Sequence, residues 1–97
     1  MHAVVVKVSV QDGPPATEFL RERVVPGVSQ APGFVAGYWV RLEGGDEGNS
    51  VIVFESEEAA RNAAGQIEGN IGENPGVTLK DVTVGEVVAS AYGSRAG

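Results

Sequence analysis

The run from Pro32 to Val40 constrains the fold most, because of its place in the order of elements along the chain. It opens a strand directly after a helical stretch. A second strand, from Val51 to Phe54, follows a glycine-rich turn, and a second helix begins at Ser56. Valine-rich runs stand near both ends of the chain. This β-α-β-β-α-β order predicts a ferredoxin-like α+β domain, with two helices on one face of a four-stranded antiparallel sheet.

The first half of the chain predicts a strand from His2 to Val10 and then a helix from about Ala16. Pro26-Gly27 falls inside the helical pattern, so we expect either a kink there or an end near Val25 followed by a further turn. The residues with helical apolar spacing are Leu20, Val24, Val28 and Ala31, with Glu18, Arg21 and Glu22 on the opposite side.

The second half predicts a hairpin of strands 34–43 and 51–55 around a turn at 44–49. Ser56 is the expected N-cap of the second helix, with Glu57 and Glu58 in its first turn. A fourth strand lies within 77–91, so residues 1–92 form a single domain and 93–97 a flexible tail. The second helix carries a stripe of small and branched residues and then a terminator: Ala60, Ala63, Ala64, Ile67 and Ile71, followed by Gly72, Asn74, Pro75 and Gly76.

Alternation along the strands predicts one face under the helices and one apolar face without a cover. Such an uncovered face predicts a homodimer, since burying it adds several kcal/mol at about 25 cal/mol per Å². Under the helices we expect Val4, Val6, Val8, Phe34, Tyr38, Val40, Ile52 and Phe54. On the uncovered face we expect Val5, Val35, Trp39, Val51 and Val53.

Composition excludes several classes of function. With 97 residues the chain fits one small domain, and its net charge of −6 without a basic cluster argues against nucleic acid. The absence of cysteine excludes disulfides, thiolate metal sites and cysteine nucleophiles. The opening apolar run is broken by Lys7 and is too short to span a bilayer, so we expect no signal peptide, no membrane partner and a cytoplasmic location.

Two short motifs carry a resemblance to a known family. Pro32-Gly33-Phe34 with the pair Tyr38-Trp39, and the segment 53–59 (VFESEEA), resemble the antibiotic biosynthesis monooxygenase-like family. That family belongs to the dimeric α+β barrel superfamily, in which two ferredoxin-like sheets face each other. The resemblance implies the fold, the dimer and a cofactor-independent oxygenase acting on an electron-rich aromatic substrate.

The departures from that family bear on haem. Haem-degrading relatives carry a tryptophan at the end of the third strand and a histidine on the second helix, and the corresponding positions here are Phe54 and Ala63. The chain's one histidine, His2, stands at its beginning. We therefore expect no haem, and no cofactor or metal of any kind.

The candidate ligand-binding residues are Trp39, Arg41 and Tyr38. Trp39 and Arg41 share a strand face, on which Trp39 would stack a flat aromatic ligand while Arg41 holds an anion or enolate. Alternatively, this face is a dimer interface with an aromatic anchor. Alternation places Tyr38 on the helix side, as a general acid in a cavity or as a core residue. The residues that could join the face of Trp39 are Lys7, Ser9, Glu43 and Glu86.

Two weaker candidates have simpler explanations. His2 could act as a base near neutral pH, although a residue at the chain's beginning is seldom held firmly. The carboxylates of Glu55, Glu57 and Glu58 fit helix capping better than a hard-cation site. The glycine-rich hairpin turn is not a phosphate cradle, since no helix or lysine follows it.

Three functions stay open. We favour a non-catalytic module that binds a small molecule or a partner, with no catalytic residue assigned. The alternatives are a cofactor-independent monooxygenase on a quinol-like or anthrone-like substrate, and a structural subunit that packs against another protein. A shaped, dry pocket favours the oxygenase. A pocket filled by side chains favours the other two.

Overall fold

The structure is a computed structural model that describes residues 1–11, 13–71 and 76–93, without the side chains of residues 70 and 71. The contact of Ile71 and the helix terminator at Gly72, Asn74 and Pro75 lie outside the described residues, as do residues 94–97 of the expected tail. The elements are β1 (His2–Val10), α1 (Gly13–Phe19), the π-helix η1 (Leu20–Val24), α2 (Val25–Ser29), β2 (Phe34–Arg41), β3 (Glu47–Phe54), α3 (Glu57–Ile71) and β4 (Val77–Glu86).

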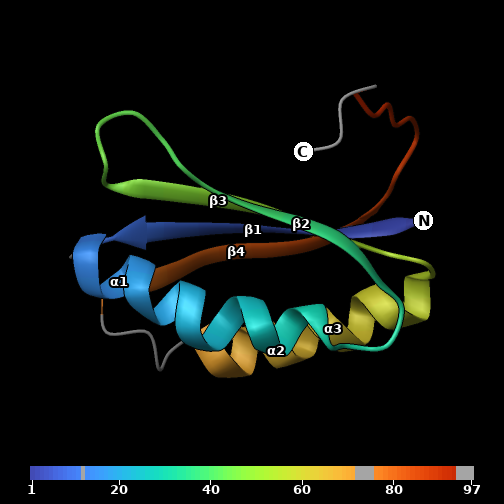
Figure 1. Ribbon diagram of the computed structural model, residues 1–97, viewed down its shortest axis with the longest axis horizontal. Helices are drawn as coiled ribbons and strands as arrows, with labels where there is room; N and C mark the ends of the chain where they lie inside the picture. The colour runs from blue at the N-terminus through green and yellow to red at the C-terminus, as the bar shows by residue number, and fades with distance from the viewer. Residues whose placement is uncertain (12, 72–75, 94–97) are drawn as a thin grey trace.

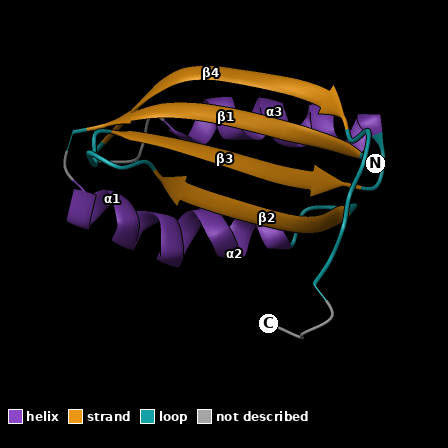
Figure 2. Ribbon diagram, turned by 90° about the horizontal axis from the view of Figure 1, so that it is seen from above, coloured by secondary structure: helices purple, strands orange, loops and turns teal. Residues whose placement is uncertain are grey.

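The strands form one antiparallel sheet in the order β2-β3-β1-β4, with β1 and β3 at its centre. All the helices cover the same face, and the other face is open (Figure 1). Seen onto that open face, α1, η1 and α2 run along the β2 edge and α3 runs behind β1 and β4 (Figure 2). The predicted ferredoxin-like α+β fold is confirmed.

The core lies between α3 and the centre of the sheet. Val4, Ile52 and Phe54 are fully buried, and the ring of Phe34 meets that of Phe54 edge-to-face at 6.1 Å between centroids. The alanine stripe predicted on α3 is confirmed, since its alanines are buried against the sheet. Their small side chains allow the backbone of α3 to lie close to the strands. The buried alanines of α3 are Ala60, Ala63 and Ala64.

The N-terminus of α3 is capped as the sequence predicts. The backbone N–H of Ala59 donates to Ser56 Oγ at 3.1 Å, and that of Ala60 donates to the Ser56 carbonyl at 3.1 Å. The second bond is the first regular hydrogen bond of the helix, so the side chain of Ser56 satisfies one otherwise unpaired amide, that of Ala59.

The faces predicted for β2 are wrong from Ala36 onward. The pairing of β2 with β3 shifts between Phe34 and Ala36, which makes Val35 the extra residue of a β-bulge. Phe34 still faces the helices, but Ala36 then pairs with Val53 on the open face. From there on, alternation puts Gly37, Trp39 and Arg41 under the helices and Tyr38 and Val40 on the open face.

The hairpin between β2 and β3 is tighter than predicted. Gly44 and Gly45 have φ of 96° and 81°, a region that glycine enters without steric cost, and the Leu42 N–H donates to the Glu47 carbonyl at 2.9 Å. The turn is therefore complete by Asp46, and β3 begins at Glu47 instead of Val51.

The first helical stretch begins earlier than predicted, at Gly13, and continues to Ser29 without a break. The Val25 N–H donates to the Leu20 carbonyl five residues earlier, which is the π-helical pattern. A π turn is wider than an α turn, and it lies directly before Pro26, whose ring would clash with the Glu22 carbonyl in a regular helix. The helical stretch therefore does not end near Val25, and a π segment precedes Pro26 instead.

The open face of the sheet is apolar, as predicted, although Trp39 is not on it. Tyr38 is 66% exposed and Val40 53%, and Val35 and Val51 are exposed beside them. The chain leaves β4 on this same side of the sheet (Figure 1). Among the residues described, no helix is long and apolar enough to cross a membrane.

Candidate functional site

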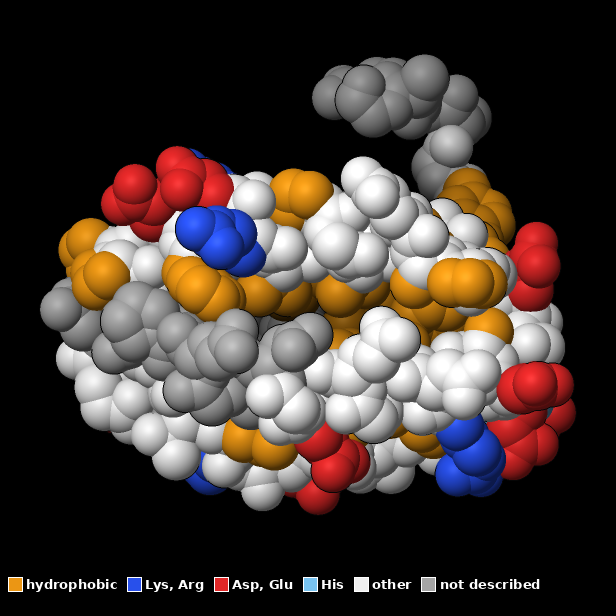
Figure 3. Space-filling view, turned by 90° about the horizontal axis from the view of Figure 1, so that it is seen from below, with side chains coloured by type: hydrophobic (Ala, Val, Ile, Leu, Met, Phe, Trp, Pro, Cys, Tyr) orange, Lys and Arg blue, Asp and Glu red, His pale blue; other side chains and the backbone are white. Residues whose placement is uncertain are grey.

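A cavity of about 870 Å³ lies between the first helical stretch and the sheet. Its walls come from α1, η1 and α2 on one side, from all four strands of the sheet on another, and from α3. Seen from the helical side, apolar side chains gather in a furrow between the two rows of helices (Figure 3). The predominantly apolar lining is typical of a small-molecule site.

The cavity exists because the two helical regions pack differently. Helix α3 lies directly on β1 and β4, whereas α1 and η1 make few contacts with any strand and only α2 approaches β2. Leu20, Val24 and Val28 point their apolar side chains into the resulting space and stay only partly buried. The first helical stretch therefore covers the sheet without packing closely against it.

Trp39 forms part of the sheet wall of this cavity. A Cβ built on Gly37 would lie 2.8 Å from Cη2 and 2.9 Å from Cζ3 of the indole, so the ring folds back along its own strand over Gly37. The same Cβ would lie 3.6 Å from Cε1 of Phe34. Because Gly37 has no side chain, the indole lies against the strand and leaves the cavity open.

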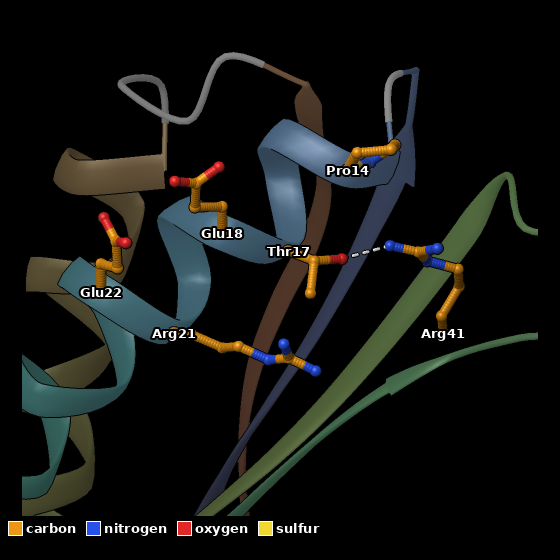
Figure 4. Close-up of a pocket in the computed structure, with 6 residues that line it drawn as sticks. All are labelled: Pro14, Thr17, Glu18, Arg21, Glu22 and Arg41. Atoms are coloured by element: carbon orange, nitrogen blue, oxygen red, sulfur yellow. Dashed lines mark hydrogen bonds between the residues drawn. The ribbon is translucent and has the colours of Figure 1, made fainter.

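Arg41 stands two residues further along β2, at the end of the cavity near α1. Its Nη2 donates to the Gly13 carbonyl at 3.1 Å and to Thr17 Oγ1 (Figure 4). Its Nε and Nη1 have no acceptor among the residues described. One guanidinium thus ties the last residue of β2 to the first turn of α1 and still has donors to spare.

A second depression of about 520 Å³ adjoins this end of the cavity. Thr17, Arg21 and Arg41 line both hollows, so the depression is the mouth of the cavity. Arg21 extends from η1 toward the sheet, while Glu18 and Glu22 direct their carboxylates away from it (Figure 4). The sequence places Arg21 on the outer side with these glutamates, and that prediction is wrong.

The ionisable lining of the cavity is entirely cationic. Of the chain's seven lysines and arginines, three line it: Arg21, Arg23 and Arg41. Among the residues described, no aspartate or glutamate lines it. A protein with a net charge of −6 therefore holds a positively charged cavity.

Of the three predicted site residues, the structure brings two together. Trp39 and Arg41 share the cavity, although on the opposite face of the sheet from the predicted one. Tyr38 pairs with Val51 on the open face, so it is neither a core residue nor a group in the cavity. Lys7 and Ser9 also lie on the open face, away from Trp39.

Sequence reasoning missed Thr17 as a site residue and misplaced Arg21. The two stand four residues apart, a spacing that puts both on one side of a helix next to Leu20 and Val24. That spacing was the available signal.

The cavity does not fit haem. Its described lining contains no histidine, cysteine, methionine or tyrosine, which are the side chains that bind haem iron. His2, the chain's one histidine, lies at the start of β1 and does not line the cavity. Among the residues described, no group of three histidine, aspartate or glutamate side chains is arranged to hold a metal ion.

No protein-family model and no curated protein matches the chain. Among solved structures, a mutant of MhuD with two manganese protoporphyrin IX molecules per active site has 25% sequence identity and a TM-score of 0.70, over 96% of this chain and all of that one. MhuD is a heme-degrader from Mycobacterium tuberculosis.

Two further solved structures show the same fold at lower identity. SnoaB, a cofactor-independent oxygenase from Streptomyces nogalater, has 17% identity and a TM-score of 0.71, over 92% of this chain and 94% of that one. A dimeric ferredoxin-like protein from an uncultured marine organism has 13% identity and a TM-score of 0.61, over 95% and 99%. The resemblance seen in the sequence is confirmed: the chain has the ferredoxin-like fold of the antibiotic biosynthesis monooxygenase-like proteins.

Proposed function

We propose that this protein binds a flat, apolar small molecule in the cavity between its first helical stretch and its sheet. The observation that carries the proposal is the cavity of about 870 Å³ with the indole of Trp39 in its wall. Apolar side chains remove the ligand from water, and the indole offers an aromatic surface for stacking. MhuD, which has the same fold, holds planar protoporphyrin molecules in its active site.

Binding can be followed directly, because Trp39 is the chain's one tryptophan. Titration with anthrone, a neutral flat aromatic compound, should quench its fluorescence saturably at one molecule per chain. Ala63→Leu should weaken this binding, since Ala63 lines the cavity and the larger side chain fills it. Asn62→Leu adds the same side chain on the exposed side of α3 and should leave binding unchanged. Absence of saturable quenching in the parent protein would contradict the proposal.

A cofactor-independent monooxygenase is the second candidate function, supported by the likeness in fold to SnoaB. A cavity that excludes water, with Trp39 against the substrate and Arg41 near a developing enolate, is a suitable environment for it. Anthrone would react with one O₂ to give anthraquinone and one water, with the substrate itself as reductant. Oxygen consumption above the protein-free rate would favour this candidate, and binding without consumption would favour the non-catalytic module.

We further propose that two copies associate through their open sheet faces. Four apolar side chains are exposed there, and a solved protein of the same fold is dimeric. Sedimentation equilibrium at micromolar concentration should give twice the chain mass of 10.0 kDa. Val51→Lys should shift the equilibrium to monomer, whereas Asn62→Lys on α3 should not. A parent protein that stays monomeric would contradict the dimer.

A further inference from the structure

We infer that the mouth of the cavity is a clamp for one anionic group, so that the ligand is an apolar monoanion such as an aromatic carboxylate. The inference deepens the proposed function and rests on it. The carboxylate would lie between Arg21 and Arg41, with the apolar body of the ligand inside the cavity along Trp39. The clamp consists of Arg21, Arg41 and Thr17, the three residues common to the cavity and its mouth.

The donors of this clamp are available. Arg41 uses Nη2 for Gly13 and Thr17, and among the residues described its Nε and Nη1 have no acceptor, so either can donate one hydrogen bond to a carboxylate oxygen. Arg21 makes no hydrogen bond or ion pair with any described residue. Thr17 accepts from Arg41 through Oγ1, and its hydroxyl hydrogen can still be donated.

The position of Arg41 is fixed before any ligand arrives. Its two contacts hold the guanidinium between the end of β2 and the start of α1, and a Cβ on Gly13 would lie only 3.0 Å from Nη1. A donor that is already placed loses little conformational freedom when it binds an anion. Arg21 approaches from the opposite side of the mouth (Figure 4).

The charge around the clamp selects for a single negative charge. Two arginines at the mouth attract an anion, and no described carboxylate lies within 4.0 Å of either one. Glu18 and Glu22 line the outer part of the mouth and direct their carboxylates outward (Figure 4). Together with the net charge of −6, they disfavour phosphates and polyanions, whose further charges would extend toward this rim.

A matched pair of probes tests the clamp. Anthracene-9-carboxylate and anthracene-9-carboxamide have the same ring system and nearly the same shape, but only the first is charged. Isothermal titration calorimetry on the full chain should show that the carboxylate binds about tenfold more tightly than the amide. Because the clamp is near the surface, added sodium chloride should reduce this preference and leave the affinity for the amide unchanged.

Variants then assign the preference to the two arginines. Arg21→Gln and Arg41→Gln should each bring the two affinities within about threefold of each other, whereas Arg61→Gln, an exposed arginine on α3, should leave the preference intact. Arg21→Gln is informative even if Arg41→Gln does not fold. Equal affinities for both probes in the parent protein would overturn the clamp and leave the proposed function standing. No binding of either probe would overturn the proposed function and the clamp with it.

Discussion

The two helical regions of this molecule cover the same face of the same sheet, yet α3 packs directly against the strands whereas the first helical stretch leaves a cavity between itself and the strands. Helix α3 presents alanines to β1 and β4 and lies against them. The stretch from α1 to α2 presents larger residues such as Leu20 and Val24, and it stands away from the strands. Large apolar side chains therefore do not ensure a filled core. The path of the backbone decides whether they meet the sheet or line a space above it.

The largest expected difference in stability between the two regions comes from truncating one apolar side chain in each. Phe54→Ala removes a fully buried ring that contacts Phe34, and it should lower the free energy of unfolding by about 3–5 kcal/mol. Val24→Ala in η1 removes a partly buried side chain at the cavity and should cost roughly 1 kcal/mol. Urea denaturation measures both values. Equal losses would show that η1 is packed as firmly as α3.

Replacing two neighbouring alanines of α3 by leucine should lower the free energy of unfolding by different amounts. Ala64→Leu should overpack the contact with the sheet and cost roughly 1–3 kcal/mol. Ala63→Leu should cost less, because Ala63 borders the cavity and a larger side chain can extend into it. The comparison of urea midpoints is the test. A greater loss for Ala63→Leu would place the cavity elsewhere.

Removing the cap of α3 should have a smaller effect. Ser56→Ala leaves the Ala59 N–H without its side-chain acceptor and should destabilise the protein by about 1 kcal/mol. Ser56→Asp keeps an acceptor at the same position and serves as the control. Thermal unfolding should distinguish the two variants, and an unchanged midpoint for Ser56→Ala would mean that water replaces the cap without loss.

The smallest expected effect is the titration of Glu57. The hydrogen bond and the charge of Arg61, whose Nη2 is 2.7 Å from Glu57 Oε2, lower the pKa of this exposed carboxyl below 4.5. Its contribution to stability is therefore complete above 4.5 and is lost as the pH falls through the lowered pKa. A carboxyl titration by NMR should give a midpoint below 4.5 that rises toward it in Arg61→Gln. An identical midpoint in that variant would assign the shift to His2 alone.

The parts of the fold that depend on neighbours in the sequence were predictable. Ser56 caps the helix that begins one residue later, and the alanine stripe of α3 follows from its helical spacing. The face of Trp39 was not predictable, because one extra residue at Val35 inverts every later position of β2 and no local pattern marks such a bulge. Trp39 and Arg41 were still predicted correctly as a pair, because both follow the bulge and therefore change from one face of the sheet to the other together.

The mouth of the cavity escaped prediction for a related reason. Arg21 belongs to η1, and the π-helical hydrogen bond from Val25 to Leu20 has no sequence signature apart from the proline that follows. Thr17 belongs to the site because it accepts a hydrogen bond from Arg41, which is 24 residues away in the sequence. Sites assembled across such separations become visible only in three dimensions.

The bulge at Val35 also affects how this chain should be aligned with others. In a homologue that lacks the extra residue, the aromatic residue that lines the cavity is aligned with Trp39 only if the alignment has a one-residue gap at Val35. Without that gap, the aromatic that lines the homologue's cavity would be matched to Tyr38, which faces the opposite side of the sheet. Conservation scores calculated from ungapped alignments would then mix two unrelated selective pressures, one for ligand contact and one for the open face.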